Sequence, residues 1–196
     1  RQADAMNNTK IVVDVIEGRP FARTEEVGCP ICGCRRESRK IAVRFGQIAM
    51  VAECSSCRIA FQTPRPSEDA SLAYMNWRWR SSNAYVANPR SQTRRARKQI
   101  KYVRRLVDKP IRLVDFGAGA GSFVRAALDQ GWDATGIETS DSALARARDF
   151  YGVELHKELT GGQYDVATMW DVIEHLERPD RFVARIAELS KPGAML

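Results

Sequence analysis

From residue 110 onward the sequence alternates between short apolar runs and amphipathic stretches, and this alternation limits the fold more than any other feature. Apolar runs predict strands at 111–116, 133–137, 153–155, 164–170 and 194–196. Apolar residues at helical spacing predict helices at 122–130, 140–151 and 180–189. Strands separated by helices at such intervals form a parallel sheet with helices on both faces. The sequence therefore predicts an α/β fold.

The first of these strands runs into a glycine-rich turn, Asp115-Phe116-Gly117-Ala118-Gly119-Ala120-Gly121, before the first helix. Glycine lets the backbone turn tightly and lets a ligand approach without meeting a Cβ. Nucleotide-like ligands bind at this end of parallel strands. The dinucleotide pattern Gly-x-Gly-x-x-Gly fails because its sixth position is Ser122. S-adenosylmethionine carries an ammonium and a sulfonium instead of a pyrophosphate, which favours a carboxylate such as Asp115.

The second strand of the predicted sheet ends at Glu138, 23 residues after Asp115. An acidic residue at this point is placed to accept hydrogen bonds from both ribose hydroxyls of a bound nucleoside. The alternative is that Glu138 belongs to a helix cap together with Thr139 and Ser140. The ribose role is the preferred interpretation.

Three polar residues, Asp171, Glu174 and His175, follow the predicted fourth strand. On a helical turn, positions i, i+3 and i+4 share one face, which would gather two carboxylates and an imidazole. They could position ligands, with His175 as general base. They could bind a divalent metal, since carboxylate and imidazole suit several. The array resembles the Glu-x-x-Glu-His metal site of small-RNA 3′-terminal 2′-O-methyltransferases, although the first acid here is Asp. They could also be structural.

Two cysteine pairs lie ahead of the α/β region and form the pattern Cys-x₂-Cys-x₂₁-Cys-x₂-Cys: Cys29, Cys32, Cys54 and Cys57. This spacing is typical of a closed tetrahedral zinc site. Apolar runs at 41–43 and 48–51 flank a turn at 45–47, which predicts a hairpin and hence a zinc ribbon. Four thiolates leave no open position, so the zinc is expected to be structural. Cys34 is interpreted as a bystander.

The net charge of +7 is concentrated in one segment. Ten basic residues and no acid lie between 78 and 105: Arg78, Arg80, Arg90, Arg94, Arg95, Arg97, Lys98, Lys101, Arg104 and Arg105. Apolar spacing predicts a helix over 91–107. The stripe could contact phosphates or be a solvated helix face.

Several of these motifs resemble those of class I S-adenosylmethionine-dependent methyltransferases. Residues 114–121 resemble their motif I, and 136–138 their second motif. Residues 164–176 are similar to the fourth-strand motif of the subfamily that includes ubiquinone-pathway and sugar methyltransferases. The final segment, 190–196, resembles the opening of their fifth strand. Residues 28–66 resemble the amino-terminal zinc-binding region of bacterial methyltransferases, many of which act on nucleotide-linked sugars or cell-surface polysaccharides.

The resemblance implies a Rossmann-like fold and a set of cofactor contacts. That set comprises Asp115, Gly117, Ala118, Gly119, Gly121, Glu138, Thr139, Trp170 and Asp171. It also favours His175 as the catalytic base, with Glu174 or Asp171 holding its tautomer. Because the family sheet has seven strands, we expect this chain to be a fragment that stops after the fourth or fifth.

The predicted organisation has four parts. An unclear segment covers 1–27, the zinc ribbon 28–66, a basic helical linker 67–109 and the cofactor-binding domain 110–196. No apolar run approaches the roughly 20 residues that a membrane span needs. No secretory signal opens the sequence either, so we expect a cytoplasmic protein without membrane contact.

Three functions remain open at this point. The preferred one is methyl transfer to a small molecule: a nucleotide-linked sugar, another saccharide or a secondary metabolite, including phosphate-bearing ones. The second is an RNA methyltransferase that binds RNA through the zinc ribbon and the basic helix. The third is a non-catalytic zinc-ribbon interaction module.

Overall fold

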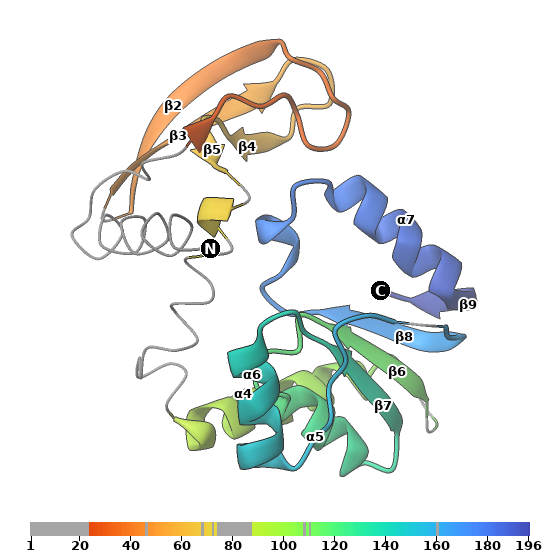
Figure 1. The fold of residues 1–196 in the computed structure, drawn as a ribbon. Helices are drawn as coiled ribbons and strands as arrows, with labels where there is room; N and C mark the ends of the chain where they lie inside the picture. The colour runs from red at the N-terminus through yellow and green to blue at the C-terminus, as the bar shows by residue number, and fades with distance from the viewer. Residues whose placement is uncertain are drawn as a thin grey trace. The chain divides into compact units, whose positions relative to one another are not determined.

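The structure is a computed structural model that describes residues 24–196 except 46, 68, 72, 74–87, 108, 110 and 160. It divides into two compact units (Figure 1). The first unit comprises residues 1–78 and 177–180, and the second comprises 79–176 and 181–196. Segment 1–23 and the predicted basic positions Arg78 and Arg80 lie outside the described residues.

The first unit is built on a three-stranded antiparallel sheet with the order β2-β3-β4. Its strands are β2 (Glu37–Phe45), β3 (Gln47–Cys54) and β4 (Ala60–Gln62). Phe45 pairs with Gln47 across the β2–β3 turn, which confirms the predicted hairpin. Two short strands, β1 (Thr24–Glu25) and β5 (Arg65–Pro66), pair antiparallel beside it.

Strand β3 delivers a cysteine to the interior of the first unit. Ala52 and Cys54 are fully buried, whereas Val51 and Glu53 are partly exposed. Alternate residues of a strand point to opposite faces. The same periodicity that buries Ala52 therefore turns the Cys54 side chain inward at the end of the strand.

The second unit contains a four-stranded parallel sheet with the order β7-β6-β8-β9. The strands are β6 (Arg112–Phe116), β7 (Asp133–Ile137), β8 (Tyr164–Met169) and β9 (Ser190–Met195). The helices are α4 (Pro89–Val103), α5 (Ser122–Leu128), α6 (Asp141–Arg146) and α7 (Pro179–Leu189), of which α7 belongs to this unit from residue 181 onward. The predicted α/β fold with a Rossmann-like parallel sheet is confirmed.

Helices cover both faces of this sheet, as Figure 1 shows for α7 on one side and α4, α5 and α6 on the other. Leu113 and Val166 pack against the α4 and α5 residues Ile100 and Phe123. Val114 and its neighbours on the opposite face pack against α7. Because successive strand residues alternate faces, the apolar runs of β6 and β8 supply both layers of the core.

Three of the elements predicted after residue 110 differ clearly from the observed ones. Residues 153–155 are described, but they do not form the expected strand. Instead, a single parallel bridge joins Ile137 to His156, just after this range. The helix expected at 140–151 consists of α6 followed by a π-helical turn, Ala147–Tyr151. The last strand begins at Ser190, four residues before the predicted start at 194.

Helix α4 begins at a regular N-cap. The Asn88 side chain accepts a hydrogen bond from the backbone N–H of Ser91 at 3.2 Å, and Pro89 occupies the first helical position. Asparagine at the cap and proline at the first position are both favoured there. The helix ends at Val103, earlier than the predicted 107. Within the described residues, no helix combines the length and apolar character that crossing a bilayer requires.

Candidate functional site

The glycine-rich turn lies at the carboxyl end of β6 and has an unusual backbone. Gly117, Gly119 and Gly121 have φ values of 68°, 56° and 79°. Such left-handed conformations are accessible to glycine and strained for most other residues. A Cβ on Gly117 would also lie 2.5 Å from the Cγ2 atom of Val172. The turn therefore needs its glycines both for its own path and for its close contact with the segment that follows β8.

Glu138 ties this turn to the end of the neighbouring strand. Its Oε2 accepts the backbone N–H of Gly119 at 2.9 Å, and its Oε1 accepts that of Ser140 at 2.8 Å. The residue is 9% exposed. Burial raises the pKa of Glu138, while the bonds from backbone N–H groups act in the opposite direction. Thr139 stands between the bonded residues and is exposed.

Asp115, at the end of β6, is a second buried carboxylate, with 2% exposure. The Thr168 hydroxyl on the adjacent strand β8 donates to its Oδ1 at 2.7 Å. Burial raises the pKa of the Asp115 carboxyl to about 7, and the negative charge of Glu138 also raises it. The carboxyl is therefore poised near neutral pH, where a neighbouring cation would favour its ionised form.

Trp170 follows β8 and packs edge-on against two aromatic rings. Its ring centroid lies 5.5 Å from that of Phe123 and 6.5 Å from that of Tyr102. Its buried Nε1 atom has no hydrogen-bond acceptor among the described residues. The buried hydroxyl oxygen of Ser140 also has no hydrogen-bond partner among them. Unsatisfied buried polar groups are rare and costly, so both point to a ligand or solvent at this edge of the sheet.

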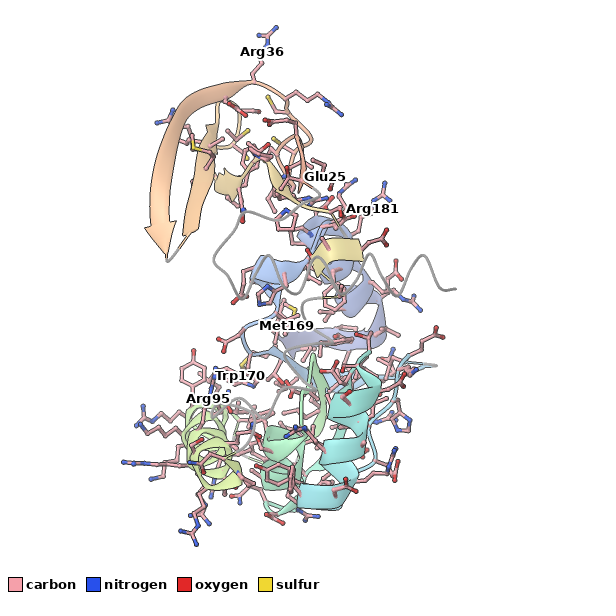
Figure 2. The ribbon with its side chains drawn as sticks, turned by 60° about the vertical axis from the view of Figure 1, so that its left-hand side comes forward. Glu25, Arg36, Arg95, Met169, Trp170 and Arg181 are labelled. Carbon is pink, nitrogen blue, oxygen red and sulfur yellow. The ribbon has the colours of Figure 1, made fainter. Side chains whose placement is uncertain are left out.

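Asp171 has a left-handed backbone, with φ of 58°. Its Oδ2 accepts a hydrogen bond at 2.6 Å from the Arg95 guanidinium of α4. Figure 2 shows the labelled Arg95 and Trp170 close together at this point. In the sequence, Arg95 stands only as one more cation of the basic stripe. Its position on the helix, at the flank of the exposed stripe, is the signal that could have distinguished it from the other basic residues.

Glu174 and His175 lie on a short 3₁₀ turn, Ile173–His175, and both are exposed. The predicted helical turn beginning at Asp171 is wrong, because the left-handed backbone of Asp171 places it outside the turn. The three side chains also do not form a metal-binding group. Within the described part of the chain, the only group of three or more suitable side chains that gathers closely enough is the cysteine cluster.

In that cluster, the Sγ atoms of Cys29, Cys32, Cys54 and Cys57 all lie within 4.8 Å of one another. Two of the separations, Cys29–Cys57 and Cys32–Cys54, are 3.5 Å. Zn–S bonds of about 2.3 Å in a tetrahedron place sulfurs about 3.8 Å apart. The cluster is therefore consistent with zinc binding.

The two cysteine loops have the same backbone pattern. The N–H of Cys29 donates to the Cys34 carbonyl and that of Cys54 to the Ile59 carbonyl, both at 2.9 Å. The residues four positions after Cys29 and Cys54 are Gly33 and Arg58, and both are left-handed, with φ of 72° and 64°. The cluster thus sits between two equivalent knuckles.

Cys34 lies outside the four-cysteine group. Its Sγ is 3.7 Å from the Ser55 hydroxyl and accepts the Arg36 N–H at 3.4 Å. This placement agrees with its interpretation as a bystander.

A family model described as a methyltransferase domain matches residues 89–196, more than half of the chain. The ubiquinone biosynthesis O-methyltransferase of Bordetella avium is 32% identical over 94 residues, covering 42% of this chain and 39% of that protein. The same-named protein of Pectobacterium atrosepticum is 31% identical over 94 residues, with 42% and 39% coverage. The chain therefore spans about two fifths of the length of these curated relatives.

Solved structures of low sequence identity also match the chain. Magnesium protoporphyrin IX methyltransferase from Synechocystis PCC 6803, with bound SAH, has a TM-score of 0.47 at 18% identity, covering 61% of this chain and 64% of that one. The PH0226 protein from Pyrococcus horikoshii OT3 has a TM-score of 0.48 at 20% identity, with 55% and 59% coverage.

Proposed function

Because this chain belongs to the methyltransferase domain family, we propose that its second unit binds S-adenosylmethionine and transfers the methyl group to a small-molecule acceptor. The observation that carries the proposal is a pair of buried carboxylates, Asp115 and Glu138, at the ends of adjacent strands β6 and β7. They flank a turn whose glycines leave the backbone accessible. A cationic nucleoside derivative matches this combination.

Glu138 is assigned to the ribose hydroxyls. A carboxylate offers about four acceptor positions. Backbone N–H groups of Gly119 and Ser140 each occupy one, on different oxygens. The remaining lone pairs can accept two hydroxyl groups without breaking either bond, so the same side chain can brace the turn and bind the ribose.

Asp115 is assigned to the cationic methionine end of the cofactor. Its Oδ1 is engaged by Thr168, and a bound ammonium would stabilise the ionised carboxylate. The buried donor Trp170 Nε1 and the Ser140 hydroxyl, at the ends of β8 and β7, fit a ligand with several polar groups. The other assigned contacts are Gly117, Ala118, Gly119, Gly121, Thr139 and Asp171.

Methyl transfer requires little of the protein beyond alignment. The methyl group is bound to a positively charged sulfur, which is a good leaving group. Holding the acceptor in line with it can contribute ~7–11 kcal/mol. When the acceptor is a hydroxyl, a base must also remove its proton, and we assign this role to His175. Glu174 is assigned to orient the imidazole. Asp171 lies at the same edge of the sheet, where its carboxylate accepts a hydrogen bond from Arg95.

The acceptor is proposed to be a hydroxyl-bearing small molecule: a nucleotide-linked sugar, another saccharide or a secondary metabolite. The names of the curated relatives, which are O-methyltransferases, support an oxygen acceptor. The resemblance of residues 28–66 to the zinc-binding region of sugar methyltransferases supports a saccharide.

The first unit is proposed to hold one structural zinc on Cys29, Cys32, Cys54 and Cys57. The donor set is chemically suited to Zn²⁺, and the separations of its sulfurs suit a tetrahedron. Four thiolates complete the coordination, so the metal would stabilise the ribbon and take no part in methyl transfer.

The function is tested by release of S-adenosylhomocysteine from S-adenosylmethionine, measured across a panel of nucleotide-linked sugars, free saccharides and phenols. We expect one class to accelerate release. With that acceptor, His175→Ala should lower kcat by ~10²–10⁴-fold and change S-adenosylmethionine affinity by no more than a few-fold. His156→Gln, a change at the other histidine, serves as the matched control.

Failure of the chain to bind S-adenosylmethionine would overturn the function itself. Near-normal turnover of the His175→Ala variant would overturn the base role alone. Activity of that variant restored only by Mg²⁺ or Mn²⁺ would also contradict it.

A further inference from the structure

Helix α4 presents a continuous basic surface whose residues have no assigned role in methyl transfer. We define the basic face as seven exposed residues of α4 and the turn that follows it: Arg90, Arg94, Arg97, Lys98, Lys101, Arg104 and Arg105. At 100° per residue, those within α4 fall inside an arc of about 100°. The buried residues Ala96, Ile100 and Val103 are centred about 140° away from the centre of that arc.

The described residues offer these seven cations little compensating charge. Arg95, on the flank, pairs with Asp171, and Arg104 donates to the neutral Gln130 side chain. Among the described residues, the other six members of the basic face form no ion pair.

The basic face also destabilises helix α4. Arg90 and Arg94, and Arg94 and Lys98, are like charges four residues apart, which destabilises a helix. Cations near its first turn further oppose the helix dipole, and no acid is present there. An anionic partner would remove this repulsion.

The spacing of the cations suits a linear polyanion. Arg90, Arg94, Arg97, Lys101 and Arg104 follow one another at intervals of three or four residues. At 1.5 Å per residue they form a row with steps of about 4.5–6 Å along the helix axis and a length of about 21 Å. Guanidinium groups bind phosphate oxygens in pairs, and this row consists mostly of arginine.

An aromatic ring borders the row. Tyr102 is 57% exposed and lies four residues after Lys98, on the adjoining side of the helix. Exposed aromatic rings beside a basic groove stack on the bases of single strands. The ring also contacts Trp170 edge-on, so it lies on the flank of α4 that leads to the strand ends.

A membrane fits this helix less well. Helices that lie in a bilayer interface insert an apolar face beneath their basic one. The apolar residues Ala96, Ile100 and Val103 of α4 are buried in the core against β6 and α5 and cannot insert. We propose that the basic face binds the phosphodiester backbone of a single-stranded nucleic acid, with Tyr102 stacking on a base.

The test is fluorescence anisotropy of the full chain with a fluorescein-labelled oligouridylate, titrated across a range of salt concentrations. Each phosphate contact contributes about 0.7 to the log–log salt slope for a single strand. The triple variant Arg94→Gln, Lys101→Gln, Arg97→Gln should therefore lower the slope by about 2. Tyr102→Ala should weaken binding severalfold or more while leaving the slope unchanged.

The matched control removes three exposed cations elsewhere in the second unit, with the changes Arg148→Gln, Lys157→Gln and Arg185→Gln. It should leave both slope and affinity near those of the wild type. Binding to anionic vesicles of phosphatidylglycerol and phosphatidylcholine is measured in parallel, to test a membrane as the alternative partner. Circular dichroism should show the α4 variant folded and at least as stable as the wild type, because its like-charge repulsion is reduced.

Three results would each overturn the proposal: no oligouridylate binding at low salt, an equal loss of slope in the control variant, or vesicle binding that depends on the basic face without nucleic-acid binding. Oligouridylate binding requires neither S-adenosylmethionine nor turnover. The affinity for S-adenosylhomocysteine, measured separately, reports on the methyltransferase function, so the two failures are distinguishable.

Discussion

The backbone N–H of Gly119 donates to the Glu138 carboxylate at 2.9 Å, joining the turn after β6 to the end of β7. The second oxygen of the same carboxylate accepts the N–H of Ser140. The bond between Gly119 and Glu138 therefore fixes the distance between two strand ends, and in the proposed function it shapes the cofactor site before the ligand arrives.

Replacing Glu138 should affect stability and ligand binding together. Glu138→Ala leaves the buried Ser140 N–H without its acceptor, at about 1–3 kcal/mol, and also frees the partly buried Gly119 N–H. It removes the proposed ribose hydrogen bonds as well. We expect a lower thermal midpoint and an affinity for S-adenosylhomocysteine at least tenfold weaker. Thermal unfolding and calorimetry measure the two effects. Glu154→Ala, a change at an exposed acid, is the control, and equal behaviour of the two variants would refute the assignment.

Asp115 should make stability and cofactor affinity depend on pH. Its pKa is raised in the folded chain to about 7 from an ordinary 3.8. The folded state therefore holds a proton that the unfolded state has lost, and stability falls as pH rises from about 4 to about 7. Chemical denaturation at several pH values should show this fall, and Asp115→Asn should remove it.

A cationic ligand favours the ionised form of Asp115, so the same shift predicts tighter S-adenosylmethionine binding as pH rises through 7, with proton release. Calorimetry in buffers of different ionisation enthalpy detects the proton. Equal proton release by the wild type and the Asp115→Asn variant would count against the proposed contact.

The cysteine cluster should bind one zinc per chain. Cys54→Ser removes a buried ligand at the end of β3, so zinc should be lost and residues 28–62 should loosen, because metal binding and folding are coupled in such modules. Cys34→Ser, outside the cluster, should keep full zinc content. Elemental analysis of protein purified without chelator checks both. Absence of zinc in the wild type, or its loss in the Cys34 variant, would contradict the site.

Substitutions at the equivalent knuckle positions Gly33 and Arg58 should change the stability of the first unit in opposite directions. Both are left-handed, and nothing lies within 4 Å of a Cβ added to Gly33, so only backbone strain opposes substitution there. Gly33→Ala should cost about 1 kcal/mol, and Arg58→Gly should stabilise the unit by up to about 1 kcal/mol. Arg58→Ala controls for loss of the ion pair with Glu53. Thermal unfolding of the zinc-loaded chain measures all three, and a destabilised Arg58→Gly variant would show that strain is not the dominant effect.

The strands β6 and β8 were predictable because they are short apolar runs that are largely buried on both faces. The strand predicted at 153–155 failed for an instructive reason. Val153 and Leu155 are buried against Leu144 and Ala147, as their alternation suggested. The backbone nevertheless joins the sheet only at His156, through bonds with Gly136 and Glu138. Burial at alternate residues indicates an extended chain but not the hydrogen bonds that make a strand.

Two contacts at the site were not predicted because they join distant segments. Thr168 donates to Asp115 across adjacent strands, and that pairing depends on the register of β6 and β8. Arg95 and Asp171 are 76 residues apart. In the sequence, Arg95 is one of many basic residues and Asp171 one of many acidic residues. Only the packing of α4 against the end of β8 pairs them.

The most direct test of the central claim is a calorimetric titration of the full chain with S-adenosylhomocysteine, for the wild type and for Gly119→Val. The wild type should bind one ligand per chain. The valine side chain would fill the backbone approach at a left-handed position with φ of 56°, so this variant should show no detectable binding while its zinc content stays unchanged. A wild-type chain that does not bind, or a Gly119→Val chain that binds equally well, would contradict the account.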